Sequence, residues 1–298
     1  MLSVEGLQCR AGGRPVIRGI SAEFQAGLLH VIVGPNGSGK STFLKAFSGE
    51  WPIEAGAVYY DGQPVAAGKP VVVGKPVAAD KPVAAGKRVT DDGKGGTAAG
   101  MSVAADKLQL AKRRAVMSQL PELHFPVRVD DIVMMGRYPH FNYRPGRHDA
   151  DICREAMARL SVLSLADRDY LSLSGGERQR VQFARALAQI WEPPVTGSRY
   201  LFLDEPVSSL DIHYQHEFLA LARSLAGEGI VLIAVLHDLN LALEYADRML
   251  FLKEGRVVAA GQAPEIVSPE LIREVFGVAA HLLQNPFGSR PVIVYETG

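Results

Sequence analysis

The chain has 298 residues, of which 47% are hydrophobic and 21% charged, and its formal net charge is zero. This length and composition suit one large domain with a sizeable core, and the lack of a basic excess argues against a nucleic-acid-binding protein. Cys9 and Cys153 are the only cysteines and lie far apart, so we expect a reducing compartment rather than a disulfide framework. No signal peptide is visible, and the longest strongly apolar run, residues 230–236, is too short to span a bilayer.

The first elements surround a glycine-rich loop. Residues 4–20 predict strands and a hairpin with Gly12-Gly13 at its turn. The apolar run 28–33 is typical of a buried strand, and residues 42–47 predict the first turns of a helix. Between them, residues 34–41 read GPNGSGKS, a full match to the P-loop pattern. A chance glycine-rich turn would not carry this strand–loop–helix context.

A P-loop cradles a nucleotide phosphate, because its glycines let several backbone N–H groups approach one anion at the N-terminus of a helix. Lys40 is expected to neutralise the β- and γ-phosphates and to act in catalysis, and the Ser41 hydroxyl is expected to hold Mg²⁺. The predicted ATP-binding residues are Gly34, Pro35, Asn36, Gly37, Ser38, Gly39, Lys40, Ser41 and Thr42.

Residues 58–62 predict a strand that ends in a turn, and a six-residue repeat follows it. Residues 64–87 read PVAAGK, PVVVGK, PVAADK and PVAAGK, with degenerate repeats up to residue 107. A hexapeptide period can indicate a β-solenoid. Each repeat, however, offers only small apolar groups and a proline that interrupts strand pairing. We therefore favour an extended, mobile surface insertion over 64–107, without a core of its own.

The second half of the chain alternates helices and strands. Helices are predicted over 148–163, 175–191 and 213–226, strands over 113–119 (running into a loop), 200–203 and 230–236, and a hairpin over 248–260. This alternation predicts an α/β core with a largely parallel sheet. Residues 120–143 place Phe125 and other apolar groups near Arg137, Tyr138 and Tyr143, which favours a partner-binding surface over interior packing.

Two buried strands end in groups able to do chemistry. The strand 200–203 runs into Asp204 and Glu205, and buried carboxylates are costly unless they meet a cation or react. Asp204 fits a Mg²⁺-associated acid, and Glu205 fits the base that polarises the attacking water, although a strand-end acid can also simply cap a turn. His237 follows the strand 230–236, from which it can reach a γ-phosphate. Gln119 can add a neutral oxygen near Mg²⁺.

A second phosphate-binding surface is predicted at residues 173–179, which read LSGGERQ. Here Ser174, Gly175 and Gly176 open a helix, so a hydroxyl and free backbone N–H groups lie at the positive end of the helix dipole. An ordinary serine N-cap explains the serine but not the double glycine after it.

With these motifs in order, the chain resembles the nucleotide-binding subunits of ATP-binding-cassette (ABC) transporters. The resemblance covers nearly all of the chain outside 64–107 and includes the P-loop or Walker A motif, Gln119, the signature 173–179, the Walker B strand 200–204 with Glu205, the D-loop 209–211 and His237. Two features depart from the family. The stretch 8–13, where an aromatic residue usually stacks on adenine, has none, and the planar guanidinium of Arg10 is the candidate substitute. Val207 stands where Thr is common after Asp-Glu-Pro, a change that we expect to be harmless.

The resemblance implies a P-loop NTPase (RecA-like) core with an antiparallel β subdomain and an inserted helical signature subdomain. It implies one domain over 1–298, with an α/β lobe from 1–118 and 177–298 and a helical subdomain over 119–176. The implied catalytic residues are Glu205, His237 and Lys40, and the implied Mg²⁺ ligands are Ser41, Gln119 and Asp204. With one copy of each motif, it also implies a head-to-tail homodimer in which Ser174, Gly175, Gly176 and Asp211 contact the partner's ATP.

Residues 131–140 resemble importers of iron chelates, haem and cobalamin, and the segments 191–199 and 210–215 are most similar to haem importers. This implies two copies of a transmembrane permease, a periplasmic haem-binding protein acting indirectly, and a peripheral place on the cytoplasmic face of the bacterial inner membrane. A siderophore or cobalamin importer remains open. A soluble cassette of translation or DNA repair is disfavoured by the single P-loop and the lack of long heptads, and a module without turnover by Glu205 and His237.

Overall fold

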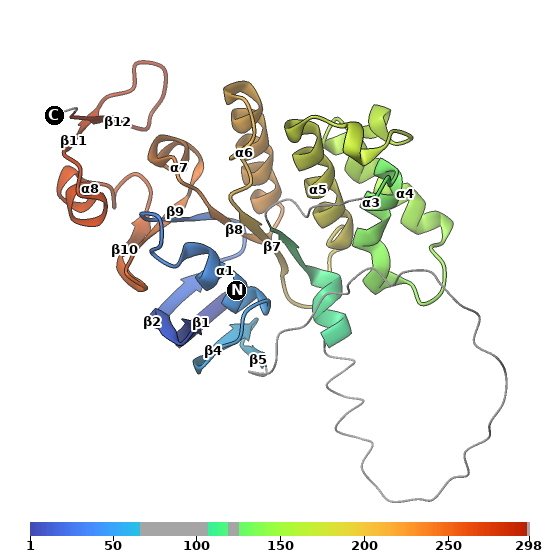
Figure 1. Ribbon diagram of the computed structural model, residues 1–298, viewed down its shortest axis with the longest axis horizontal. Coiled ribbons are helices and arrows are strands. Elements are labelled where there is room, and N and C mark those ends of the chain that lie inside the picture. Colours follow the sequence, from blue (N-terminus) through green and yellow to red (C-terminus); the bar gives the residue numbers. More distant parts are fainter. Residues whose placement is uncertain (66–106, 119–124, 297–298) are drawn as a thin grey trace, which may run out of the picture.

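The computed structural model describes residues 1–65, 107–118 and 125–296 (Figure 1). The predicted insertion, apart from its ends, and Gln119 lie outside these ranges. Among the described residues, no helix is long and apolar enough to cross a bilayer.

An antiparallel sheet is formed by the first strands of the chain. Its order is β2 (Arg14–Phe24), β1 (Leu2–Ala11), β4 (Ala55–Tyr60) and β5 (Gln63–Val65). β1 and β2 form the predicted hairpin, and Gly12 and Gly13 at its turn have φ of 55° and 79°. Glycine adopts this left-handed backbone without the steric cost that a Cβ brings.

The second sheet carries the candidate site. Its order is β10 (Arg256–Gln262), β9 (Arg248–Lys253), β3 (Leu29–Val33), β8 (Ile230–Val235), β7 (Arg199–Asp204) and β6 (Arg114–Met117). The strands β9, β3, β8, β7 and β6 are parallel, and β10 pairs antiparallel at one edge. The predicted α/β core with a largely parallel sheet is confirmed.

Both faces of this parallel sheet are buried, which explains why its strands read as continuous apolar runs. On one face, Ile32, Phe202 and Ile233 pack with α1 (Lys40–Ser48) and the antiparallel sheet. On the other face, Val31, Leu201 and Leu232 join a larger cluster with the remaining helices. The helix α1 therefore lies in a layer between the two sheets.

The helices of the second face include α5 (Gly175–Gln189), α6 (Ile212–Gly227) and α7 (Leu239–Tyr245). A group of short helices packs around α5 at one end of the molecule (Figure 1). It consists of α3 (Val129–Met134), η1 (Met135–His140), α4 (Arg147–Arg159), η2 (Leu163–Leu165) and η3 (Tyr170–Ser172).

One sequence prediction needs correction, and two regions contain elements that the sequence does not predict. The helix predicted over 148–163 ends at Arg159, because Ser161 adopts a left-handed φ of 54° that interrupts the helix. The sequence does not predict α3 and η1, which lie in the segment 121–147, rich in prolines and aromatics. At the C-terminal end, α7, α8 (Pro269–Phe276) and the hairpin of β11 (Ala280–Leu283) and β12 (Val292–Tyr295) were also not predicted.

Candidate ATP site

The P-loop lies between β3 and α1, and two of its glycines are fixed by close backbone approach. A Cβ on Gly34 would lie 2.1 Å from the carbonyl oxygen of Leu252, and one on Gly39 would lie 2.9 Å from Cδ1 of Ile17. Gly39, the N-cap of α1, also has a φ of 100°. The loop therefore presses against β9 and β2, and no larger residue fits at these two positions.

Lys40 lies inside this loop and is 5% exposed. Its Nζ donates to the carbonyl oxygens of Gly34 at 2.9 Å and Pro35 at 3.1 Å. Burial lowers the pKa of this ammonium, and the nearby carboxylates of Glu205 and Asp204 oppose that shift. The buried Ser38 hydroxyl has no hydrogen-bond partner among the described residues. A phosphate oxygen would supply partners for both groups.

Asp204 ends β7 beside the start of α1 and is 2% exposed. Its Oδ1 accepts a hydrogen bond of 2.8 Å from Ser41 Oγ, and its Oδ2 lies 3.7 Å from Lys45 Nζ. Oδ2 accepts no hydrogen bond among the described residues. A hydroxyl beside a carboxylate with one oxygen that accepts no hydrogen bond from the described part of the chain is a hard-oxygen donor set that fits Mg²⁺. Sequence reasoning missed Lys45, which lies about one helical turn beyond Lys40 on α1.

Glu205 and His237 are brought together because β7 and β8 are neighbours. His237 Nε2 lies 2.6 Å from Glu205 Oε1. Glu205 has a φ of 53°, a left-handed conformation that is uncommon for a residue with a Cβ. The carboxylate thus lies at the strand ends, directly after Asp204 in the chain and beside the His237 ring.

The residues Ser174–Gly176, here called the signature turn, begin α5, and side chains of this helix cap it. Ser174 Oγ accepts from the backbone N–H of Glu177 at 3.3 Å, and Glu177 Oε2 accepts from the Ser174 N–H at 2.8 Å. These bonds form a capping box and lower the pKa of Glu177. A Cβ on Gly176 would lie 3.2 Å from Cδ2 of Leu210, so the turn packs against the predicted D-loop of the same chain.

The sequence also predicts roles for Asp211, Gln119 and Arg10. Asp211 is the exposed N-cap of α6, and its side chain makes no capping bond. Gln119 lies outside the described residues. Arg10 is bound through Nε to Glu54 Oε2 at 2.8 Å and through NH1 to the Gly13 carbonyl at 3.3 Å.

The proposed partner surface needs one correction. Arg137, expected at its rim, is 1% exposed. Its guanidinium donates to Asp149 at 3.0 Å, to Glu192 at 2.7 Å and to the Ala188 carbonyl at 2.9 Å. The prediction of a surface role for Arg137 is wrong, because an arginine that joins η1, α4 and the end of α5 is a structural tie. Phe125, Tyr138 and Tyr143 are exposed.

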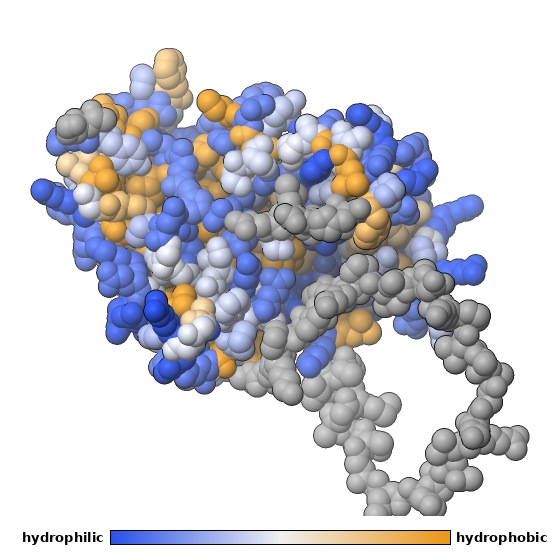
Figure 2. Space-filling model, in the orientation of Figure 1, coloured by the Kyte–Doolittle hydropathy of each residue, from blue (hydrophilic) through white to orange (hydrophobic). Residues whose placement is uncertain are grey.

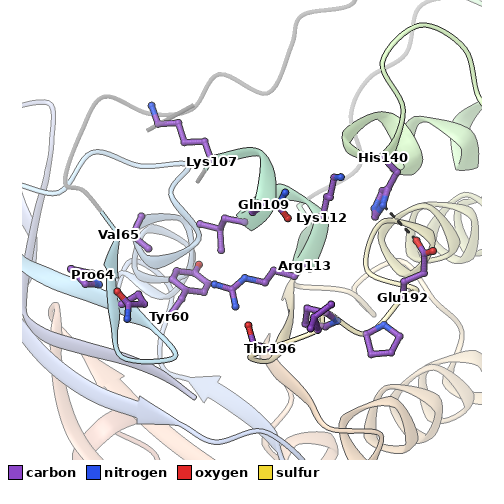
Figure 3. A pocket seen from close by; sticks show the side chains of 15 residues that line it. Tyr60, Pro64, Val65, Lys107, Gln109, Lys112, Arg113, His140, Glu192 and Thr196 are labelled. Atoms are coloured by element: carbon purple, nitrogen blue, oxygen red, sulfur yellow. Dashed lines mark ion pairs between the residues drawn. The ribbon is translucent and has the colours of Figure 1, made fainter. Parts of the chain in front are cut away.

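A cavity of about 730 Å³ lies away from the P-loop, between β5, helical residues 107–113 and residues 192–196 (Figure 3). Tyr60, Arg113 and the ion-paired His140 and Glu192 line it, and none of the P-loop, Walker B or signature residues does. On the face shown in Figure 2, hydrophobic residues lie in small groups among hydrophilic ones. The nucleotide chemistry is therefore assigned to the strand ends and not to this cavity.

The chain is similar to known proteins of one family. The ABC transporter family matches residues 17–208. A protein named Hemin import ATP-binding protein HmuV from Gloeobacter violaceus is 39% identical, with 99% of this chain and 94% of the relative covered. A protein of the same name from Pseudomonas aeruginosa is 37% identical, with 99% of both chains covered.

Solved structures share the fold. A metal-chelate type ABC transporter in an inward-facing conformation matches with a TM-score of 0.73 and 23% identity, covering 99% of this chain and 97% of that one. The dimeric bacterial cassette MJ0796 matches with a TM-score of 0.64 and 20% identity over 88% of this chain and 98% of that one. The chain belongs to the family of ABC transporter ATP-binding proteins, and it is an ATPase.

Proposed function

We propose that this chain is the ATP-hydrolysing subunit of a haem importer. One observation carries the proposal. At the carboxyl ends of the parallel strands, a buried P-loop lysine lies with the Ser41–Asp204 pair and the Glu205–His237 pair. The near-full-length similarity to proteins named as hemin import subunits supports haem as the transported solute.

In the proposed mechanism, the backbone N–H groups at the start of α1 and the Lys40 ammonium bind the phosphates of ATP. The ammonium exchanges its two carbonyl acceptors for phosphate oxygens. Ser41, Asp204 and, by resemblance, Gln119 would hold Mg²⁺, which neutralises phosphate charge when bound. Glu205 orients and polarises the attacking water, and His237, 2.6 Å from its carboxylate, positions that carboxylate and contacts the γ-phosphate.

The proposed assembly is a head-to-tail homodimer. Ser174, Gly175 and Gly176 of one subunit would close over ATP held by the P-loop of the other, with Asp211 beside them. The exposed position of Ser174 and Gly175 at the start of α5 supports a ligand that comes from outside this chain. Two permease copies, a periplasmic haem-binding protein and a place on the cytoplasmic face of the inner membrane complete the proposal.

The surface that meets the permease is proposed to include Phe125 and Tyr138, which are both exposed. Phe125 is the first described residue after Gln119. Phe125→Ala should keep the ATPase rate of the isolated subunit and weaken its co-purification with the permease. The exposed Val195, far along the chain in the 192–196 loop, provides a control as Val195→Ala. Equal co-purification of both variants with the permease would contradict this surface.

The transported solute is tested in vesicles that contain this chain together with the permease with which it co-purifies. ATP-dependent accumulation of haem, with no accumulation of a ferric siderophore or cobalamin, is the expected result. Preferred uptake of the ferric siderophore or of cobalamin would contradict haem as the solute and support that alternative instead. The Glu205→Gln variant, which should not accumulate any solute, controls for leakage.

A further inference from the structure

Two glutamine side chains from different helices contact the turn that follows Glu205. From α6, Gln215 Nε2 donates to the carbonyl oxygens of Val207 at 3.3 Å and Leu210 at 2.9 Å. From α5, Gln179 contacts Glu205, Pro206 and Ser209 of the same turn. The helix α5 begins at Ser174–Gly176, which we propose to contact the partner's ATP. Gln179 therefore connects that turn to Glu205, which we propose as the base for hydrolysis in this chain.

Both ends of the Gln179 amide are used. Its Nε2 donates to the Pro206 carbonyl and, at 3.5 Å, to the Glu205 carbonyl, and its Oε1 accepts from Ser209 Oγ. The side chain is 4% exposed, so water offers no substitute partners. Losing one partner inside a protein leaves the other group unpaired and is costly. Gln179 therefore fixes the backbone around Glu205 and Pro206 relative to α5.

The Glu205 backbone needs such support. A glutamate at φ 53° is held in a conformation that its Cβ disfavours, and such residues persist when their surroundings over-determine them. The Glu205 carbonyl also accepts from Ser208 Oγ at 3.1 Å, within the same turn. Gln179 reaches this carbonyl from outside the turn. Its loss should let the Glu205 carboxylate leave its position beside the phosphate site.

The signature turn is close enough to transmit movement. Gln179 lies in the second turn of α5, five residues after Ser174, and the capping box stiffens the first turn. A Cβ on Gly175 would lie 3.8 Å from Ser209, and one on Gly176 would lie 3.2 Å from Leu210. A shift of Ser174–Gly176 toward a phosphate would therefore move Gln179 and the Glu205 turn together.

We propose that Gln179 is a positioning residue for hydrolysis, which sets the position of Glu205 according to the position of the signature turn. The inference rests on the proposed roles of Glu205 and of Ser174–Gly176. In the proposed dimer, ATP on the partner's P-loop engages this chain's signature turn. Gln179 then aligns this chain's Glu205, so that occupancy of one site prepares hydrolysis at the other.

The test compares Gln179→Leu with Gln182→Leu in the full-length chain. Gln182 lies on the same helix and is 2% exposed, but its Nε2 donates to Tyr170 Oη at 2.9 Å, within the helical group. Gln179→Leu should lower kcat about tenfold or more, an effect of the size expected for a misplaced catalytic group. The KM for ATP should change by less than about twofold, because no phosphate contact is removed.

Gln182→Leu should leave kcat within about twofold of wild type, although it also removes a buried polar contact. Equal losses of kcat in the two variants would mean that Gln179 matters only for packing and would overturn the proposal. A Gln179→Leu variant that raises KM and keeps kcat would overturn it as well, because the residue would then act on binding.

A gentler variant keeps the proposal testable if Gln179→Leu does not fold. Ser209→Ala removes only the hydroxyl that donates to Gln179, and it should lower kcat about threefold. If Gln179→Leu does fold, Ser209→Ala should lower kcat in the wild-type chain but not further in the Gln179→Leu variant. An equal loss of kcat in both chains would contradict the coupling between the two residues. Glu205→Gln separates the two proposals. If it hydrolyses at the wild-type rate, the base is misassigned. If it is slow while Gln179→Leu is normal, only the positioning role fails.

Discussion

Two helices of this chain begin at glycine-rich turns, and they differ in what satisfies their first N–H groups. At the start of α1, the N-cap is Gly39, no side chain caps the helix, and the neighbouring Lys40 is buried. At the start of α5, Ser174 and Glu177 cap the helix, and the turn is exposed. The first turn is therefore built to need an anion, whereas the second is stable without one.

This difference fits the division of labour that we propose. A turn that lacks caps and lies around a buried ammonium gains strongly from a bound phosphate, so it should carry most of the binding energy. A self-capped, exposed turn loses little when the ligand leaves, so it suits a contact that forms and breaks in each cycle. Variants on the two sides should therefore fail in different ways.

The largest effect is expected where the two regions meet, at Glu205. Glu205→Gln keeps the shape of the side chain but removes the charge that polarises water, so hydrolysis should fall by about 10²–10⁴-fold. Binding at α1 and closure at α5 should both survive. ATP should then hold the variant as a dimer in size-exclusion chromatography. Hydrolysis at the wild-type rate would identify another residue as the base.

The next effect should fall on the α1 side alone. Lys40→Ala removes charge-assisted hydrogen bonds to phosphate, worth about 1.5–3 kcal/mol, which corresponds to a loss of affinity of roughly 10–150-fold. Equilibrium binding of ATP to the isolated chain measures it. Unchanged affinity in a folded Lys40→Ala variant would remove the phosphate-binding role from this loop.

A smaller effect, on kcat rather than on ATP affinity, is expected from Gly175→Ala at the start of α5. Gly175→Ala fits sterically, because its nearest neighbour, Ser209, lies 3.8 Å from the new Cβ. Gly175 is one of the residues that we propose to contact the partner's ATP, so the added methyl group should disturb that contact. ATP binding to the isolated chain should stay within about twofold, while kcat should fall by about tenfold, the pattern of a contact made in the closed state. Weaker binding with normal kcat would contradict the comparison.

Acid should lower the stability of the fold through His30, a buried histidine in β3. Burial lowers the pKa of His30 to about 4, although its hydrogen bond with Gln25 opposes the shift. The unfolded chain therefore binds this proton more readily. The free energy of unfolding should drop as pH falls from about 6.5 toward 4, by about 1.4 kcal/mol per pH unit. His30→Gln should flatten this slope in urea unfolding between pH 7 and pH 5, and an unchanged slope would rule His30 out.

The smallest effect is expected from the repeat segment. Its six-residue units carry no groups able to build a core. Replacing residues 66–106 with a short glycine–serine linker should therefore leave the ATPase rate within about twofold of wild type. A variant that is insoluble or inactive would show that the segment supports the fold. The temperature of unfolding, measured alongside, distinguishes lost stability from lost chemistry.

Much of the α/β core could be predicted, because its signals are local. The apolar runs that became β3, β7 and β8 are buried on both faces, and turn residues bound the β1–β2 and β9–β10 hairpins. The short helices α3 and η1 were missed, because prolines and aromatics mask helical periodicity over six-residue elements. Arg137 was misplaced for a related reason. An arginine is expected at the surface, and only partners distant in sequence, such as Glu192, permit its burial.

The sequence by itself determined the family, the P-loop, the acids that end β7 and the serine–glycine turn of α5, since each is a short motif that its own residues define. Only the tertiary structure brought Ser41 to Asp204, Glu205 to His237 and Gln179 to the turn after Glu205. These pairs join segments up to 163 residues apart. Which strands become neighbours is decided by the packing of both sheet faces, and that depends on the whole chain rather than on any local pattern.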